Sequence, residues 1–504
     1  MTSVADVIRW NRRRYPHKRA VVDEHSEMTH LELSDRAWSI AQGLLSEGVR
    51  PGDTVGLMSG NSVFGVAAYL GIAAAGAVAV PYNWRWAVPE LAYGIADSGA
   101  SIVLVEARWE AQVRSALETD PGSARQVFVE GSRFDAMTGS ASDPQVEQEP
   151  DDINVVLYTG GTTGVPKGVM LSNRNVVANA LNEIVDTDMS HSDTTLLITP
   201  MFHSASLLSW FLPHLMLGAT SVLLREFDTR VIGQTMERER VTKGFFVPSM
   251  VRQLLAAGIF HEFDMSSYHR MYVGGATFKM SDKKMITAAL PAVDLYYQYG
   301  LTEAGPIVTR MQPDDMFRPD IDGSIGREFL LTEVSIRGTV DDVELAPGEV
   351  GELCVRGPSV MVGYLDRRDA TDEALRGGWL RTGDAASVDV EGFVYLHDRI
   401  KDMIKSGGEN VYSQEVERVL YSHPAVQEAA VIGVQSEAWD EEVRAVVALW
   451  HGREVTEDQL REHCRPHLAG YKIPKRIAFV AASALPINPS GKIVKTELRS
   501  RDIW

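Results

Sequence analysis

Residues 158–168 of the chain, Tyr-Thr-Gly-Gly-Thr-Thr-Gly-Val-Pro-Lys-Gly, combine the small, polar and cationic residues that bind phosphate groups. The run follows the short apolar segment 155–157, which is predicted to be a strand. Glycines let backbone amides gather around an anion, threonine hydroxyls add donors, and Lys167 adds positive charge. Because the spacing does not match GxxxxGK followed by Ser or Thr, an ordinary P-loop is not indicated. The segment therefore predicts a phosphate-binding loop of another kind.

This segment resembles the first signature of the adenylate-forming superfamily, which includes acyl-CoA synthetases, amino-acid adenylation domains and firefly luciferases. The resemblance extends from about residue 30 to residue 499 and points to the acyl-CoA synthetase branch. It implies that the loop contacts ATP through Thr159, Gly160, Gly161, Thr162, Thr163, Gly164 and Lys167.

A second segment, Gln298-Tyr-Gly-Leu-Thr-Glu303, is similar to the second nucleotide motif of the same superfamily. By this resemblance Tyr299 and Gly300 contact the nucleotide. Thr302 supplies a hydroxyl donor to phosphate, and Glu303 supplies a carboxylate for Mg²⁺, which prefers oxygen ligands. Any one such motif is common, but their order and spacing along one chain make a chance match very unlikely.

Further positions follow from the resemblance. Gly274, Gly275 and Ala276 resemble the turn on which adenine rests. Asp384, in Thr-Gly-Asp, resembles the residue that binds the ribose hydroxyls, which needs a side chain with two acceptors, and Arg399 resembles the second ribose contact.

The C-terminal part resembles the mobile lid of the superfamily. Lys401 matches the hinge, where a few dihedral angles would rotate the small domain. Lys405, Gly407 and Gly408 would face the active site only after rotation and would leave room for the pantetheine arm of coenzyme A. Lys492, in Pro-Ser-Gly-Lys, matches the lysine that neutralises charge during adenylation. The resemblance thus implies an AMP-forming acid–thiol ligase that uses ATP, Mg²⁺ and coenzyme A.

The acid is predicted to be bulky and apolar. Amino-acid adenylation domains carry a Phe-Asp pair where this chain has Phe202-His203, so an amino acid is disfavoured. The resemblance places His203 at the mouth of the acyl pocket; a structural histidine is the other interpretation. An apolar wall favours a hydrophobic acid, although single members of it could be plain core. The predicted wall residues are Leu207, Trp210, Phe211, Phe246, Met250 and Val273.

The sequence departs from the pattern of the superfamily at four places. Gly160 replaces a Ser and Thr277 replaces a Pro. Residues 328–333 replace a Pro-rich segment, and Asp440-Glu441 replaces a Gly. Three of the four lie around the nucleotide site. An enzyme specialised for the thioester-forming step is therefore one alternative, and an acyl-AMP ligase that loads a carrier protein is another. A catalytically dead binding module would predict losses at Lys492, Glu303 or Asp384, yet all three are present.

The elements that position these residues alternate between helical and strand-like patterns, which predicts α/β layers with largely parallel sheets. We expect a helix over 31–45, strands at 54–58 and 101–106, and a buried helix and short strand within 64–81. Residues 118–150 are polar and acidic and are predicted to be an exposed connection. The predicted domains are 1–398, with a β-rich part at about 322–398, a hinge at 399–402, and a lid at 403–504. Within the lid we expect helices at 413–421 and 456–468 and strands at 426–433 and 442–449.

Composition narrows the class of protein. The 504 residues are 45% hydrophobic and carry a net charge of −19, which argues against nucleic acid or an anionic membrane as the main partner. Two cysteines cannot build a disulfide framework and are expected to be reduced and buried. With no secretory pattern and no apolar run of ~20 residues, we expect a cytoplasmic protein without integral membrane association. The oligomeric state is left open, with a homodimer as one option.

Overall fold

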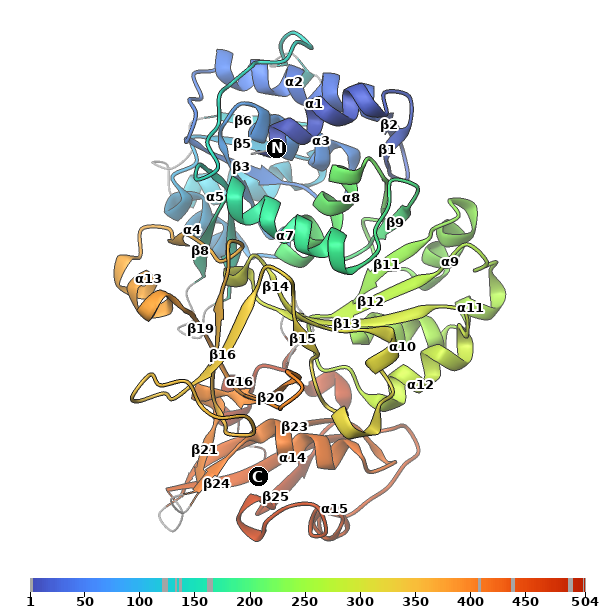
Figure 1. Ribbon diagram of the computed structural model, residues 1–504, viewed down its shortest axis with the longest axis vertical. Coiled ribbons are helices and arrows are strands. Elements are labelled where there is room, and N and C mark those ends of the chain that lie inside the picture. The colour runs from blue at the N-terminus through green and yellow to red at the C-terminus, as the bar shows by residue number, and fades with distance from the viewer. Residues whose placement is uncertain are drawn as a thin grey trace. The chain divides into compact units, whose positions relative to one another are not determined.

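The computed structural model of the protein describes residues 3–119, 126–131, 134–135, 138–160, 166–406, 409–436, 440–487, 493–501 and 503 (Figure 1). The chain divides into two compact units. Unit 1 comprises Met1–Asp322, Gly326–Val334 and Val355–Leu380, and unit 2 comprises Gly323–Ile325, Ser335–Cys354 and Arg381–Trp504. The predicted hinge at 399–402 lies inside unit 2 and stays a prediction.

Unit 1 contains a large mixed sheet whose central strands are parallel, as the alternating pattern predicts. Its outer strands β2, β14 and β15 pair in antiparallel fashion. In spatial order the strands are β15 (Arg327–Glu328), β14 (Ile307–Met311), β13 (Asp294–Gly300), β12 (Arg270–Gly274), β11 (Lys243–Phe246), β9 (Thr194–Leu197), β10 (Thr220–Leu223), β1 (Arg19–Val22) and β2 (Glu27–Thr29).

A further sheet of unit 1 is also largely parallel, with β7–β8 and β8–β18 as antiparallel pairs. Its spatial order is β18 (Gly363–Tyr364), β8 (Lys167–Ser172), β7 (Ile153–Thr159), β4 (Val78–Pro81), β3 (Thr54–Met58), β5 (Ile102–Val105) and β6 (Gln126–Val129). Parallel strands direct their carboxyl ends to one edge, where ligand-binding loops of α/β proteins gather.

Helices cover these sheets, and the largest core cluster combines residues from both sheets with α2, α3, α7 and the π-helix η2. Gly71 of α3 lies so close to α2 that an added Cβ would be 2.6 Å from the Ile40 side chain, so a glycine allows the close approach. The helices of unit 1 are α1 (Val4–Arg14), α2 (His30–Ser46), α3 (Val63–Ala74), α4 (Val88–Ser98), α5 (Glu110–Thr119), α7 (Asn173–Asp186), η2 (Ala205–Phe211), α8 (Leu212–Leu217), α9 (Thr229–Arg238), α10 (Pro248–Ala256), α11 (Ile259–Glu262), α12 (Met280–Ala289) and α13 (Arg368–Ala374).

Unit 2 holds the C-terminal α+β part and most of a smaller sheet, β16 (Glu333–Arg337), β17 (Gly351–Arg356), β19 (Leu380–Val388) and β20 (Val394–Arg399), in which β19 and β20 are antiparallel. The C-terminal sheet is built on the long hairpin of β23 and β24, which is buried on both faces. Its elements are β21 (Ile404–Ser406), β22 (Glu409–Val411), α14 (Ser413–Tyr421), β23 (Val426–Ser436), β24 (Asp440–Leu449), α15 (Glu457–Cys464), β25 (Arg476–Phe479) and α16 (Lys495–Ser500).

The layered α/β fold with a small α+β part is confirmed, and the elements expected from periodicity appear with shifts at their ends. Two expectations need correction. Residues 118–150 are not merely an exposed connection, because Gln126–Val129 forms strand β6 beside β5 and Phe134 is fully buried. The helix predicted at 456–468 ends at Cys464, two residues before Pro466, which has no amide hydrogen to continue the helical hydrogen bonds. Both cysteines are free and buried, as expected.

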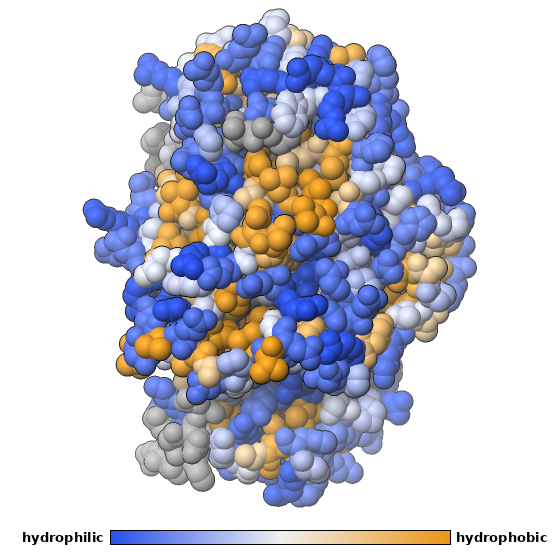
Figure 2. All heavy atoms as spheres, viewed as in Figure 1, coloured by the Kyte–Doolittle hydropathy of each residue, from blue (hydrophilic) through white to orange (hydrophobic). Residues whose placement is uncertain are grey.

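Among the described residues, no helix is both long enough and apolar enough to cross a bilayer. Apolar side chains nevertheless reach the surface, and Figure 2 shows them gathered over the middle of one face. The exposed large apolar residues of unit 1 include Leu181, Val185, Leu330 and Leu331. Two of these belong to the 328–333 segment that departs from the usual sequence pattern.

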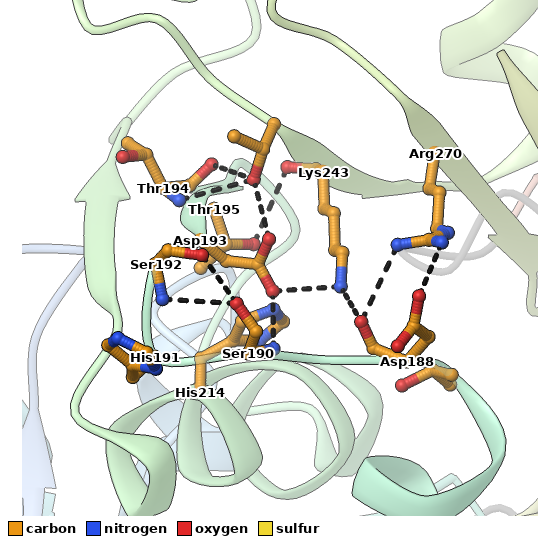
Figure 3. Close-up of polar contacts among 12 residues, drawn as sticks. Asp188, Ser190, His191, Ser192, Asp193, Thr194, Thr195, His214, Lys243 and Arg270 are labelled. Carbon is orange, nitrogen blue, oxygen red and sulfur yellow. Dashed lines mark hydrogen bonds and ion pairs between the residues drawn. The ribbon is translucent and has the colours of Figure 1, made fainter.

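A buried ion pair fixes the amino-terminal ends of β9 and β11 (Figure 3). Lys243 is 1% exposed, and its Nζ lies 2.8 Å from Asp193 Oδ2 and donates to the Asp188 carbonyl at 2.6 Å. Burial lowers the pKa of Lys243, an effect that Asp193 partly offsets. The neighbouring His214 ring is bonded to the Trp210 carbonyl, and burial lowers the pKa of His214 to about 4, so the ring is neutral at pH 7.

Removing one partner of this pair is expected to be costly. Lys243→Met leaves the Asp193 carboxylate buried without its cation, and should lower the free energy of unfolding by about 3–5 kcal/mol. Urea unfolding followed by circular dichroism measures the change. The exposed Lys284→Met is the matched control and should stay within about 0.5 kcal/mol of the wild type. Equal effects of the two substitutions would show that the Lys243 pair does not stabilise unit 1.

Candidate active site

The second nucleotide motif forms the tip of the β13–β14 hairpin in unit 1. At Gly300 an added Cβ would lie 2.0 Å from the carbonyl oxygen of Pro306 in the returning chain, so no larger residue fits. The amide of Met361 donates to the carbonyl of Glu303 at 2.9 Å. The backbone of the tip is therefore held closely, and with it the positions of Thr302 and Glu303.

The side chains at this tip meet residues from two other segments. The Thr302 and Ser204 hydroxyls are 2.9 Å apart, and Ser204 is buried. The Tyr364 hydroxyl donates to Glu303 Oε1 at 3.0 Å, and Lys167 Nζ lies 4.9 Å from the centre of the Tyr364 ring. Tyr364 thus brings together Lys167 of the first motif and Glu303 of the second.

Tyr364 and Ser204 were not singled out from the sequence. Tyr364 belongs to the two-residue strand β18, which pairs with β8 just after Lys167. A two-residue strand leaves no periodic pattern in a sequence, so only the pairing reveals this contact. Ser204 follows His203 directly and precedes the π-helix η2.

The first motif is described at its two ends. Thr159 closes β7 and pairs with Lys167 at the start of β8. Gly160 is exposed, and no described atom lies within 4 Å of the position that its Cβ would take. The predicted contacts at Gly161, Thr162, Thr163 and Gly164 lie outside the described residues.

The predicted adenine turn follows β12, beside β13. Gly274 pairs with Gln298, and an added Cβ at Gly274 would lie 2.9 Å from the Gln298 carbonyl oxygen. Gly275 has φ +80°, a left-handed conformation that favours glycine. The Tyr297 hydroxyl donates to the Ala276 carbonyl at 3.2 Å. The turn therefore lies next to the half-buried Tyr299 and the hairpin tip.

The two predicted ribose contacts lie in unit 2, where they face each other. Asp384 of β19 and Arg399 of β20 are register partners, and Arg399 Nε lies 2.8 Å from Asp384 Oδ1. Arg399 also donates to the Thr382 carbonyl at 3.0 Å. This pairing orients the Asp384 carboxylate.

The predicted lid residues are described only in part. Lys405 is exposed on β21, and its amide donates to Glu441 Oε2 at 2.7 Å. Glu441 belongs to the Asp440-Glu441 departure noted in the sequence, and its side chain supplies an acceptor for the Lys405 backbone. The remaining predictions, the Lys401 side chain, Gly407, Gly408 and Lys492, lie outside the described residues.

His203 is half-buried next to η2, with its ring centre 4.3 Å from that of Phe202. Desolvation, aided by the positive charge of Arg85, lowers the pKa of His203 to about 4. The imidazole is therefore neutral at pH 7 and can donate or accept a hydrogen bond, but it brings no positive charge to a carboxylate.

The predicted acyl-wall residues are distributed over several elements. Leu207, Trp210 and Phe211 lie on η2 and are buried, and Phe246 and Val273 are buried in β11 and β12. The Trp210 indole donates to the Leu196 carbonyl at 3.0 Å and packs on Tyr272, as a core residue would. Leu207 lines a cavity of about 20 Å³, whereas Met250 lines a larger one of about 260 Å³.

The larger cavity is not the purely apolar pocket expected from the sequence. It combines two indoles with three arginines, and its lining includes Trp84, Arg85, Arg108, Trp109, Arg225 and Glu226. The Trp84 and Trp109 rings are stacked at 5.8 Å, and a guanidinium covers each ring at 4.7 and 4.6 Å. The sequence contains one indication of this cavity. Trp84-Arg85 follows the carboxyl end of the parallel strand β4, and Arg108-Trp109 follows that of β5.

The two signature glycines are expected to differ in their tolerance of a side chain. Gly300→Ala places a Cβ against the Pro306 carbonyl and should displace the hairpin tip, weakening ATP binding at least about tenfold. Gly160→Ala enters space free of described atoms and should change ATP affinity by less than about threefold. Isothermal titration with ATP measures both. Equal losses in the two variants would contradict the assignment of the tip as the rigid part of the site.

Comparisons with known proteins identify the family. A family model described as AMP-binding enzyme matches residues 8–365, and one described as AMP-binding enzyme C-terminal domain matches residues 415–492. A feruloyl-CoA synthase from an Amycolatopsis species is 39% identical over 487 residues, which cover 96% of each chain.

Two more relatives support the same assignment. The long-chain-fatty-acid–CoA ligase FadD13 of Mycobacterium tuberculosis is 35% identical over 492 residues, covering 96% of each chain. The crystal structure of ATP-bound MatB from Rhodopseudomonas palustris covers 98% of each chain with a TM-score of 0.90 and 27% identity. The chain therefore belongs to the AMP-binding enzyme family, in its branch of AMP-forming acid–CoA ligases.

Proposed function

We propose that the protein joins a bulky hydrophobic carboxylic acid to coenzyme A in two steps, with an acyl-adenylate as the intermediate. The observation that carries the proposal is the convergence of Thr302, Glu303 and Lys167 around Ser204 and Tyr364, since it unites both nucleotide motifs. A hydroxyl, a carboxylate and an ammonium group so placed suit a magnesium-bound triphosphate.

In the first step an oxygen of the acid's carboxylate attacks the α-phosphorus of ATP. A new carbon–oxygen–phosphorus anhydride forms, the bond to the β-phosphate breaks, and pyrophosphate leaves with the electron pair. The carboxylate is itself the nucleophile, so the protein needs to align the two reactants and offset negative charge. We assign the hydroxyl of Thr302 to the phosphates and Lys492 to the space between carboxylate and α-phosphate.

The donor set at Glu303 fits a magnesium ion carried mainly by the nucleotide. Mg²⁺ commonly binds through one or two carboxylates together with substrate phosphates. Within the described ranges, no three His, Cys, Asp or Glu side chains are grouped to hold a metal ion by themselves. When bound, Mg²⁺ would neutralise phosphate charge, and the Tyr364 hydrogen bond would orient the carboxylate that holds it.

In the second step the thiol sulfur of coenzyme A attacks the acyl carbon. The thioester bond forms, the acyl–oxygen bond to AMP breaks, and the thiol proton passes to solvent. We propose that the predicted lid, residues 403–504, changes orientation at Lys401 between the steps, so that Lys405, Gly407 and Gly408 serve the thiol while Lys492 serves adenylation. Asp384 and Arg399 would hold the ribose.

The hydrophobic acid is supported by the side chains at positions 200–211 and by His203. The smaller cavity is lined by Met201, Phe202 and Leu207 together with Leu57, Ser59, Gly60, Gly65, Tyr69 and Pro81. The neutral His203 offers a hydrogen bond without charge, which disfavours a second carboxylate on the substrate. Two of the relatives are named feruloyl-CoA synthase and long-chain-fatty-acid–CoA ligase, and both names refer to bulky acids.

Coenzyme A is supported as the acceptor by the arginine-lined cavity of unit 1. Arg85, Arg108 and Arg225 offer guanidinium groups to phosphates, and Trp84 and Trp109 offer planar faces. Arg108 and Arg225 already pair with Glu226 and Glu106, so a phosphate ligand would have to compete for them. The alternatives are a carrier-protein thiol as acceptor and an enzyme that performs only the thioester-forming step.

An acid panel tests this proposal. We expect pyrophosphate exchange, AMP release and a thioester detected by mass with ferulate, octanoate or palmitate, and little turnover with acetate or phenylalanine. Each reaction contains free coenzyme A and an acyl carrier protein in competition, so the product mass also identifies the acceptor. If no pyrophosphate exchange occurs but coenzyme A still reacts with supplied acyl-AMP, the protein is instead an enzyme specialised for the thioester-forming step.

Lys492→Ala separates the half-reactions. Loss of the ammonium should lower acyl-AMP formation by at least about a hundredfold, because the charge at the α-phosphate is no longer offset. Attack of coenzyme A on supplied acyl-AMP should stay within about threefold of the wild type. The variant Lys472→Ala is the control, since that lysine pairs with Glu415 in the same unit. Equal loss of both half-reactions in Lys492→Ala would contradict the assigned role.

A further inference from the structure

Helix α7 presents a buried row of polar side chains to the interior of unit 1. Asn175, Asn179, Asn182 and Glu183 follow the spacing of one helix face, and all are at most 6% exposed. Polar groups buried in a core need partners, so this face must be bonded to surrounding elements. Each of the four side chains forms its hydrogen bonds with a different part of unit 1.

Asn179 is bonded to two segments that the proposed reaction uses. Its Nδ2 donates to the Leu208 carbonyl at 3.1 Å and to the Ser209 hydroxyl at 3.3 Å, both on the π-helix η2. Its Oδ1 accepts from the Ile307 amide at 3.3 Å, where β14 begins after the hairpin tip. One side chain therefore joins η2, which carries three of the six predicted acyl-wall residues, to the hairpin of the second nucleotide motif.

Glu183, one turn further along, strengthens the same connection. Its Oε2 accepts from Arg310 Nη2 at 2.9 Å and from Gln298 Nε2 at 3.1 Å. Gln298 and Arg310 are register partners on β13 and β14, so Glu183 bonds both strands of the hairpin. The Ser209 hydroxyl also interacts with Glu183, which extends the network back to η2.

Burying the Glu183 carboxylate and the Arg310 guanidinium costs free energy that a purely structural role would not require. Burial raises the pKa of Glu183 to about 7 in spite of Arg310 and Gln298. Arg310 is 3% exposed, and its Nε and Nη1 have no hydrogen-bond partner within the described part of the chain. Apolar residues of similar volume usually serve a core as well or better than a buried ion pair. The network lies between η2 and the β13–β14 hairpin, so a functional role would involve both of these segments.

A direct contact links the same two segments at the other end of η2. Ser204, at the start of η2, meets the Thr302 hydroxyl at 2.9 Å. The segment 200–211 and the hairpin tip are thus joined twice, once through Ser204 and once through α7. A displacement of η2 by a bound acid would be transmitted to Thr302 and Glu303 by both routes.

We propose that Asn179 and Glu183 are positioning residues that couple occupancy of the acid site to the placement of the nucleotide hairpin. The inference rests on the proposed function, because it assumes an acid at η2 and a nucleotide at Thr302 and Glu303. An acid that fills its site moves or steadies η2, and the α7 network carries this change to β13 and β14. Binding of acid and nucleotide is then mutually reinforcing, and both affinities change by the same factor.

The experiment measures this coupling by equilibrium binding to the full-length protein. Titration calorimetry gives the Kd of α,β-methylene-ATP, which cannot be cleaved to an adenylate, with and without saturating ferulate or palmitate. The wild type should bind the analogue at least about fivefold more tightly with one of these acids. Asn179→Ala should reduce the effect to less than about twofold, and Glu183→Gln, which keeps volume, should reduce it in the same direction.

Asn182→Ala is the matched control. Asn182 lies on the same buried face, but it bonds Thr332 and the Leu331 amide rather than η2 or the hairpin. It should retain the wild-type coupling. If Asn179→Ala fails to fold, as judged by its thermal transition, Glu183→Gln decides the question.

The possible failures are distinct. A wild-type protein that binds both ligands without coupling, or coupling that survives in Glu183→Gln and Asn179→Ala, overturns the inference alone. The same holds if Asn182→Ala loses as much coupling as Asn179→Ala. A wild-type protein that binds no nucleotide overturns the proposed function, and this inference with it.

Discussion

The backbone contact at Gly300 is the constraint on which the proposed chemistry of unit 1 depends. The chain turns there so tightly that the opposing Pro306 carbonyl occupies the space of any side chain. The backbone positions of Thr302 and Glu303 are consequently fixed by main-chain packing. Their side chains are oriented by hydrogen bonds with Ser204 and Tyr364. Catalysis that works mainly by alignment and charge compensation requires this kind of prior fixing of the reacting groups.

Parallel sheet geometry explains which segments lie around the tip of the β13–β14 hairpin. Strands β12 and β13 run side by side, so the glycine turn after β12 and the hairpin tip after β13 end at one edge. The first motif reaches the same region from the other sheet of unit 1, through β8 and its partner β18. Helix α7 lies against both systems, because Asn175 donates to the Pro358 carbonyl ahead of β18 and Asn179 accepts from the Ile307 amide at the start of β14.

The sequence alone predicts the fold class, most elements and the hairpin motif, because these depend on local periodicity and on contiguous signatures. It does not predict contacts between distant short segments. Tyr364 belongs to a two-residue strand, and its bond to Glu303 spans 61 positions. The arginine-lined cavity is assembled from five separate strand ends, so each contribution resembles an ordinary loop. Strand β6 was missed because it is only four residues long, Gln126–Val129, and small and polar residues flank it on both sides.

Asn179 illustrates a different limit. Within a helical pattern, an asparagine on the apolar face resembles an imperfection in periodicity, and only the bonds to Leu208 and Ile307 show its two-sided role. The acyl wall shows the opposite problem, since Trp210 and Phe211 were apolar as predicted and are also well-packed core residues. Hydrophobicity identifies what is buried, and it does not distinguish a lining residue from its support.

The stacked indoles of Trp84 and Trp109 have an optical consequence. Two rings 5.8 Å apart and inclined by 27° interact electronically, and each is also covered by a guanidinium. Their near-ultraviolet circular dichroism and emission therefore depend on the spacing of the rings and on the position of the arginines. Any anion that draws Arg85 or Arg108 away changes this signal, so the protein carries an intrinsic spectroscopic reporter at the cavity itself.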